Sequence, residues 1–128
     1  MTKIHAKFDG VGKSLPEKVL TNADLEKMVD TSDEWITTRT GVKERRILSP
    51  GESINDHCVK AAKEAIEKSG CNPDEIDLIV NCTFTSDYIL PSGACIIQDK
   101  LGLSRNVPAF DLAAACSGFM YGVETANS

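Results

Sequence analysis

The chain has 128 residues, 41% hydrophobic and 26% charged, which is typical of one globular domain and excludes disordered, collagen-like and coiled-coil chains. Its 14 basic and 19 acidic residues give a net charge of −5, and phosphate neutralisation needs a basic surface, so the composition disfavours a general nucleic-acid binder. No apolar run would span a bilayer, and residues 1–5 lack the apolar core of a signal peptide. We therefore predict a cytoplasmic protein with neither nucleic-acid nor membrane partners.

The cysteine pattern predicts free thiols and no metal site. The sequence contains five cysteines without a C-x-x-C pair: Cys58, Cys71, Cys82, Cys95 and Cys116. Their odd number and wide spacing fit a reducing compartment. Neither His5 nor His57 lies near a cysteine pair at metal-ligand spacing. We interpret His57 as a helix-surface residue and assign packing roles to Cys82 and Cys95.

The first third of the chain predicts one strand and two short helices. Residues 3–12 alternate in polarity and then reach two glycines, a pattern that predicts a strand entering a turn, with a loop following it. Two capping-box patterns predict the helix starts. The predicted helices are 22–29, capped by Thr21 with Asp24, and 32–38, capped by Thr31 with Glu34 and ended by Gly41.

An exposed extended segment is predicted at residues 42–48, since few of its side chains are apolar. Lys43, Arg45 and Arg46 lie in it, and with Arg39 they form the one basic cluster of the sequence. Such a charge run is more often a solvated surface than a binding site, although it also suits an anionic ligand.

The remaining elements alternate between helix and strand. An amphipathic pattern opened by Ser53 with Asp56 and stopped by Gly70 predicts a helix over 53–69. The predicted elements that follow are a buried parallel strand at 76–83, a helix at 91–100, a short buried strand at 109–112, and a turn leading into a last helix. This βαβ order predicts a mainly parallel sheet with helices on both faces.

Cys116 lies in the predicted turn between the second buried strand and the last helix, among residues with very small side chains. Small neighbours leave the sulfur accessible, and a helix N-terminus favours both a thiolate and an oxyanion. These properties suit acyl transfer from a thioester. The alternative is a buried packing cysteine, which is what most free cysteines are, and the turn alone does not decide between them.

Three segments closely resemble β-ketoacyl-acyl carrier protein synthase III, a family with the thiolase fold. They are TNADLEKMVDTSDEWI at 21–36 with TRTG at 38–41, PSGAC at 91–95, and AFDLAAACSGF at 109–119. The resemblance covers nearly the whole chain and implies that residues 1–128 are an N-terminal thiolase-like half-domain, truncated before the C-terminal half. It implies that the helix after Cys116 is buried. It also implies that Cys116 accepts the acyl group and supplies one oxyanion contact through its backbone N–H.

The same resemblance implies the reaction and its partners. Family members start type II fatty acid synthesis as homodimers. They move an acyl group from coenzyme A to the cysteine, condense it with malonyl-acyl carrier protein and release carbon dioxide. Coenzyme A is then a substrate, and no resident cofactor or metal is expected. The histidine and asparagine needed for decarboxylation have no counterpart in residues 1–128, so we expect no condensation by this chain alone.

Four further residues take their expected roles from the resemblance. Trp35, the only tryptophan, is expected to stack on the adenine of coenzyme A, because a broad π-face suits that contact. Thr31 is expected beside it and Arg39 at a phosphate. Leu90 is expected in the acyl pocket of the partner subunit, where it would influence primer size. For Trp35 and Leu90 the alternatives are a core indole and an ordinary dimer contact.

Two other functions compete with this one. A non-catalytic fragment or binding module would keep part of the coenzyme A site and never become acylated. Another thiolase-fold condensing enzyme, such as a hydroxymethylglutaryl-coenzyme A or long-chain acyl condensing synthase, is disfavoured by the segment around Trp35. The sequence does not specify the length or branching of the primer, or the surface that docks the carrier protein.

Overall fold

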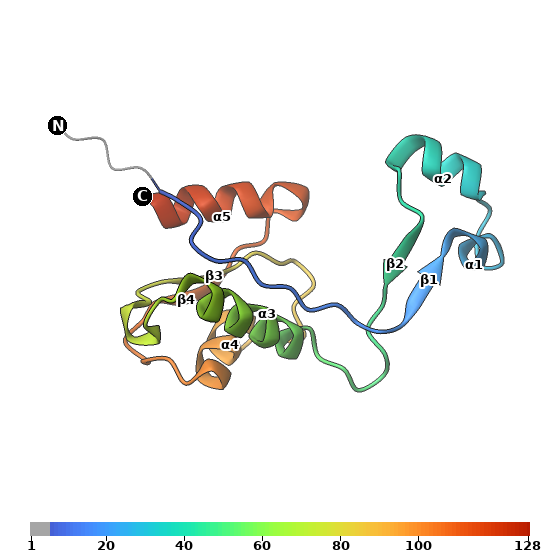
Figure 1. Ribbon diagram of the computed structural model, residues 1–128. Coiled ribbons are helices and arrows are strands. Elements are labelled where there is room, and N and C mark those ends of the chain that lie inside the picture. Colours follow the sequence, from blue (N-terminus) through green and yellow to red (C-terminus); the bar gives the residue numbers. More distant parts are fainter. Residues whose placement is uncertain (1–5) are drawn as a thin grey trace. The chain divides into compact units, whose positions relative to one another are not determined.

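A computed structural model describes residues 6–128, so the beginning of the predicted strand, at residues 3–5, lies outside the described residues. The chain divides into two compact units. We call residues 15–52 the smaller unit, and residues 6–14 together with 53–128 the larger unit. The elements of both units are labelled in Figure 1.

The smaller unit is a two-stranded antiparallel ribbon with two helices between its strands. Strand β1 (Val19–Thr21) pairs with β2 (Glu44–Arg46), placing Val19 opposite Arg46 and Thr21 opposite Glu44. Helices α1 (Asn22–Glu26) and α2 (Asp33–Thr40) lie between them in the chain. The exposed extended segment is thus confirmed as β2, whereas β1 falls where the sequence predicts a loop.

Capping residues set the bounds of both helices. Thr21 forms the predicted capping box of α1, because it accepts a hydrogen bond from the Asp24 amide while the Asp24 carboxylate accepts one from the Thr21 amide. The prediction that Thr31 caps α2 is wrong. Ser32 is the cap, and its hydroxyl accepts a hydrogen bond from the Trp35 amide at 3.0 Å. The spacing rule alone cannot choose between adjacent Thr and Ser residues, since both side chains can cap.

The larger unit has a parallel pair of strands joined by a helical crossover. Strand β3 (Ile79–Asn81) lies beside β4 (Ala109–Asp111), with Ile79 opposite Ala109. Helix α4 (Gly93–Leu101) connects them and packs on both, and α3 (Ile54–Ser69) packs against α4. Helix α5 (Gly118–Asn127) lies on the side of the strands opposite to α4 in Figure 1. Only its two glycines, Gly118 and Gly122, are buried, so the prediction that the helix after Cys116 is buried is wrong for α5 as a whole.

The alternation of side chains along β3 explains this layering. Leu78, Val80 and Cys82 line a pocket together with α5, whereas Asn81 contacts groups beside α4. Successive residues of a strand point to opposite faces, so β3 contacts helices on both faces. The buried hydrophobic side chains of this unit come mainly from α3, α4 and the residues after α4: Val59, Ala94, Ile97 and Leu103. The predicted parallel βαβ architecture is confirmed.

The part of the predicted first strand that is described, residues 6–12, forms no strand. It runs along α3 instead, and a Cβ atom at Gly10 or Gly12 would collide with the carbonyl oxygens of Ala65 and Ala61. The two glycines therefore allow a close backbone approach to the helix, which the alternating polarity does not reveal.

Helix α3 differs from its prediction in two side chains. His57 is only 9% exposed, and a hydrogen bond of 2.7 Å joins its Nδ1 to the hydroxyl of Ser14, so its assignment to the helix surface is wrong. Ser53 caps the helix by accepting from the Asn55 amide. It forms no reciprocal pair with Asp56, whose carboxylate pairs with Lys100 instead. Among the described residues, no helix has the length and apolarity needed to cross a membrane.

Candidate functional site

Cys116 lies on an exposed, strained turn of the larger unit. After β4 the chain makes one 3₁₀ turn, Ala115–Ser117, and continues directly into α5 at Gly118. Ala115 has φ of 45°, the only positive value outside glycine among the described residues. A side chain in that region costs about 1–2 kcal/mol, and such strain is concentrated at functional sites. The Cys116 side chain is exposed and precedes the positive end of the α5 dipole.

A carboxylate at the end of β4, four residues before this turn, joins three elements of the larger unit. Asp111 accepts hydrogen bonds of 2.8 Å from the backbone N–H groups of Gly93 and Ala94 and from the side chain of Asn81. Burial would raise the pKa of Asp111, but the bonds from Asn81, Ala94 and Gly93 leave that pKa lower than usual. The carboxylate therefore joins β3, β4 and the first turn of α4. No local sequence pattern predicts this role of Asp111, because only the fold brings these groups together.

The loop that carries Leu90 is tied to α3 by a second carboxylate. Asp87 accepts hydrogen bonds from the Ser53 hydroxyl at 2.5 Å and from the Asn55 side chain at 3.2 Å. Asn55 is nearly fully buried, at 1% exposure. Leu90 and its neighbour Ile89 are by contrast 88% and 99% exposed. The base of the loop is thus anchored while its apolar end lies at the surface.

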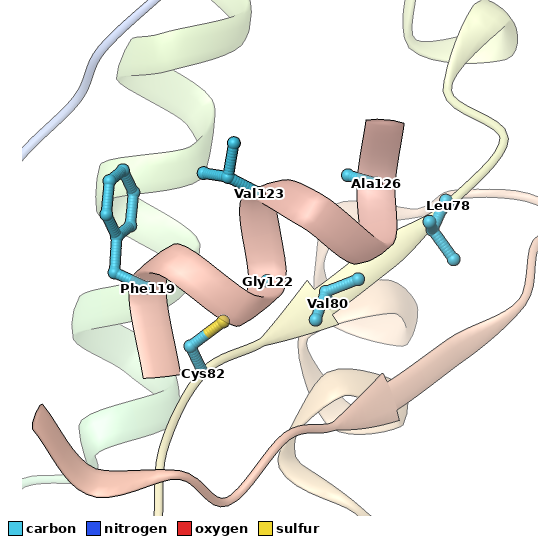
Figure 2. Close-up of a pocket in the computed structure, with 7 residues that line it drawn as sticks. All are labelled: Leu78, Val80, Cys82, Phe119, Gly122, Val123 and Ala126. Atoms are coloured by element: carbon cyan, nitrogen blue, oxygen red, sulfur yellow. The ribbon is translucent and has the colours of Figure 1, made fainter. Parts of the chain in front are cut away.

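An apolar pocket of about 240 Å³ lies between β3 and the helix that follows Cys116. Figure 2 shows its lining residues: Leu78, Val80 and Cys82 from the strand side, and Phe119, Gly122, Val123 and Ala126 from α5. The sulfur of Cys82 points toward α5, where a Cβ atom at Gly122 would collide with it. Only glycine lets α5 approach the strand this closely.

The residues expected at coenzyme A gather on one side of α2 in the smaller unit. The Trp35 side chain is 52% exposed, and the guanidinium carbon of Arg39 lies 4.4 Å from the centre of its ring. This is a cation–π contact, made one helical turn apart. Thr31 and Trp35 line one hollow, and Trp35 and Arg39 line the next. An indole with a cation on its face and open space beside it can stack on a flat aromatic ligand that carries negative charge.

The basic cluster is smaller than the sequence predicts. Arg45 donates a hydrogen bond of 2.8 Å to the Asn22 side chain. Arg46 forms an ion pair with Glu44 at 3.6 Å and donates to the carbonyls of Pro16 and Glu17. Both side chains are thus bound within the smaller unit. Asn22 is only 2% exposed, and no sequence pattern distinguishes it from any other polar residue in the first turn of a helix.

Cys116 and Leu90 belong to the larger unit, whereas Thr31, Trp35 and Arg39 belong to the smaller one. Over residues 6–128, no group of three or more His, Cys, Asp or Glu side chains is arranged to bind a metal ion.

Proteins of known name match the chain over nearly its whole length. It is 53% identical over 125 residues to the β-ketoacyl-[acyl-carrier-protein] synthase III of Caldanaerobacter subterraneus subsp. tengcongensis, a match that covers 98% of this chain and 38% of the relative. It is 56% identical over 119 residues to the β-ketoacyl-[acyl-carrier-protein] synthase III of a Sulfurovum species, a match that covers 92% of this chain and 35% of the relative. The chain thus spans a little over a third of the length of these curated relatives.

Solved structures agree. The 3-oxoacyl-[acyl-carrier-protein] synthase III of Aquifex aeolicus superposes with a TM-score of 0.83 at 51% identity, over 91% of this chain and 37% of that one. A priming β-ketosynthase from the R1128 polyketide pathway superposes with a TM-score of 0.84 at 38% identity, over 94% of this chain and 36% of that one. OleA of Xanthomonas campestris, at 24% identity and a TM-score of 0.80, shares the fold.

A scan against models of protein families found no match. The relatives and the solved structures nevertheless agree with each other over more than nine tenths of the chain. These 128 residues belong to the β-ketoacyl-[acyl-carrier-protein] synthase III family and have its thiolase-like α/β fold.

Proposed function

We propose that the chain supplies the acyl-accepting cysteine of an enzyme that starts type II fatty acid synthesis. In this proposal an acyl group passes from coenzyme A to Cys116 and is then condensed with malonyl-acyl carrier protein, with release of carbon dioxide. The observation that carries it is the position of Cys116, exposed on a strained turn between a parallel strand and α5. Membership of the synthase III family supports the same reaction.

The acylation step uses groups of this turn. The Cys116 thiolate attacks the thioester carbonyl, forming a carbon–sulfur bond and a tetrahedral intermediate with a negative oxygen. The backbone N–H of Cys116 is proposed to donate to that oxygen. When the intermediate collapses, the bond to the sulfur of coenzyme A breaks, and that sulfur leaves as a thiolate and takes up a proton. Condensation needs decarboxylation, and we assign that step to residues outside this chain.

Coenzyme A is proposed to bind as a substrate on α2 of the smaller unit. Its adenine would stack on Trp35 beside Thr31, and a phosphate would attract the Arg39 guanidinium. The exposure of Trp35 and its contact with Arg39 support this role. Leu90 is proposed to enter the acyl pocket of a second copy in a homodimer, which its 88% exposure permits.

The test is intact-protein mass spectrometry after incubation with acetyl-coenzyme A. We expect one acetyl group on the chain and none on the Cys116→Ala variant, because no other thiol lies on the catalytic turn. Cys95→Ala is the matched control, since Cys95 is also an exposed cysteine of the larger unit, and it should retain the adduct. An adduct that persists in Cys116→Ala would remove this residue from the proposed role.

A second candidate is a binding module that holds coenzyme A and transfers nothing. The observation in its favour is that Thr31, Trp35 and Arg39 all lie within residues 15–52, so their arrangement needs no part of the larger unit. A chain folded by circular dichroism that binds coenzyme A yet stays unmodified in the mass spectrum would support this candidate over the first.

A further inference from the structure

A buried asparagine holds the helix that carries Trp35. Asn22 opens α1, and its side-chain amide donates hydrogen bonds to the carboxylate of Asp33 at 2.7 Å and to the backbone carbonyl of Val42 at 2.8 Å. A longer contact of 3.4 Å reaches the Thr37 hydroxyl. Its carbonyl oxygen accepts from Arg45 at 2.8 Å. Both ends of this side chain are therefore engaged, and it is only 2% exposed.

The two contacts that Asn22 makes with side chains of α2 lie on the side of the helix away from the proposed ligand. Asp33 and Thr37 are four residues apart and share one face of the helix. Trp35 and Arg39 follow them by two residues each, which turns them by about 200° around the helix axis. Asn22 thus supports α2 from behind, while the opposite face presents the indole to solvent.

Apolar packing contributes little to the placement of α2. Ile36 is its one buried residue, and the helix has no continuous apolar stripe of the kind that fixes most surface helices. The contacts of Asn22 reach the first turn of α2, its middle and the residue after its terminal Gly41. A single side chain therefore bonds to groups at both ends of the helix.

We propose that Asn22 is a positioning residue for coenzyme A binding: it fixes the orientation of α2, and so of Trp35 and Arg39, without touching the ligand. The inference rests on the proposed role of Trp35. It adds a residue that acts only through α2.

Two substitutions separate this role from simple stability. Asn22→Ala removes every side-chain hydrogen bond of this residue, whereas Asn22→Asp keeps an acceptor for Arg45 but cannot donate to Asp33 or Val42. We expect each to weaken coenzyme A binding by about ten- to a hundredfold, the equivalent of one hydrogen bond to a charged group. Transfer of acetyl to Cys116 from a short thioester without a nucleotide should stay within about twofold of the unsubstituted rate, because that donor makes no use of α2.

The matched control is Thr21→Val, which removes the capping hydroxyl of α1 next to Asn22 but no contact with α2. It should lower stability and leave the affinity for coenzyme A unchanged. Asp33→Ala removes only one of the contacts and should weaken binding less than Asn22→Ala. This milder variant keeps the inference testable if Asn22→Ala does not fold.

Trp35 is the only tryptophan of the chain, so its fluorescence reports on α2 even without a ligand. Changed acrylamide quenching in the Asn22 variants, and none in Thr21→Val, is expected if Asn22 orients the helix. Unchanged quenching and affinity in folded Asn22 variants would overturn the inference. If Trp35→Ala leaves coenzyme A binding intact, the proposed binding site fails, and the quenching result still decides whether Asn22 orients α2.

Discussion

Different kinds of contact stabilise the interior of each of the two units. In the smaller unit the buried residues are Asn22 and Ile36, and hydrogen bonds fix the helix that carries Trp35. The larger unit packs helices on a parallel strand pair, and its carboxylate Asp111 joins both strands to the first turn of α4. Polar contacts thus hold the helix with the exposed Trp35, whereas helix packing on a strand pair holds the larger unit.

The difference matches the proposed tasks of the two units. A stacking surface needs an exposed ring held in one orientation. A nucleophile must lie within a fraction of an ångström of its productive position relative to the oxyanion donors. We therefore expect substitutions in the larger unit to affect stability most, and substitutions on α2 to affect binding alone.

The largest expected effect is that of Asp111→Ala. It removes a carboxylate that accepts three hydrogen bonds and leaves the first turn of α4 without its partner. We expect a loss of about 2–4 kcal/mol in the free energy of unfolding, measured with urea. The control is Asp99→Ala, which lies on α4 itself. Its exposed ion pair with Arg105 should contribute almost nothing to the free energy of unfolding. Equal effects of the two substitutions would refute the anchoring role.

On the smaller unit, Trp35→Ala should weaken coenzyme A binding by about 1–3 kcal/mol, because it removes the stacking surface. Calorimetric titration with coenzyme A measures this loss. Stability should hardly change, since the indole is 52% exposed. Phe84→Ala, which truncates another exposed aromatic residue in the larger unit, serves as the control and should bind normally. An unchanged affinity in Trp35→Ala would return the indole to a purely structural role.

Gly122→Ala tests how tightly the larger unit packs behind Cys116. The added Cβ would collide with the sulfur of Cys82, and we expect a loss of about 1–3 kcal/mol in thermal or urea unfolding. In a Cys82→Ala background, Gly122→Ala should instead raise the free energy of unfolding, because alanine is a better helix former than glycine by about 0.5–1 kcal/mol. The double-mutant cycle isolates this one contact, and the absence of coupling would show that α5 lies farther from the strand.

The smallest effect concerns acid pH and the start of α1. Hydrogen bonds from the Thr21 side chain and backbone, followed by that from Lys27, lower the pKa of Asp24 from 3.8 to about 2. A carboxyl whose pKa is lowered by folding stabilises the fold above its ordinary pKa and loses that contribution as the pH falls through the folded value. Helix content of the smaller unit should therefore fall between about pH 4 and pH 2. Circular dichroism measures the helix content as the pH is lowered, and the loss should be smaller in Thr21→Val. The same pH dependence in Thr21→Val and in the unsubstituted chain would contradict the capping box.

Local signals predicted much of the fold. The ends of α3 and α4 follow from Gly70 and Gly102, which adopt φ of 68° and 72°, and from the capping residues Ser53 and Ser92. The turn that carries Cys116 was recognisable because small side chains and a strand-to-helix junction are adjacent in the chain. Each of these features depends on neighbours within a few residues.

Features that depend on distant residues were not predictable. Strand β1 has three residues and is defined by its pairing with β2, more than twenty residues later. Asn22 and Asp111 gain their importance from partners on other elements. Residues 6–12 look like a strand by alternation, yet their glycines serve contact with α3.

The most direct test of the central claim is to locate the acetyl group by peptide mapping after reaction with acetyl-coenzyme A. Three of the five cysteines, Cys82, Cys95 and Cys116, are exposed, so exposure alone would spread the label among them. The strained turn before α5 predicts acetylation of Cys116 only. Label shared among the exposed cysteines, or found on Cys82 or Cys95 in preference to Cys116, would contradict the account.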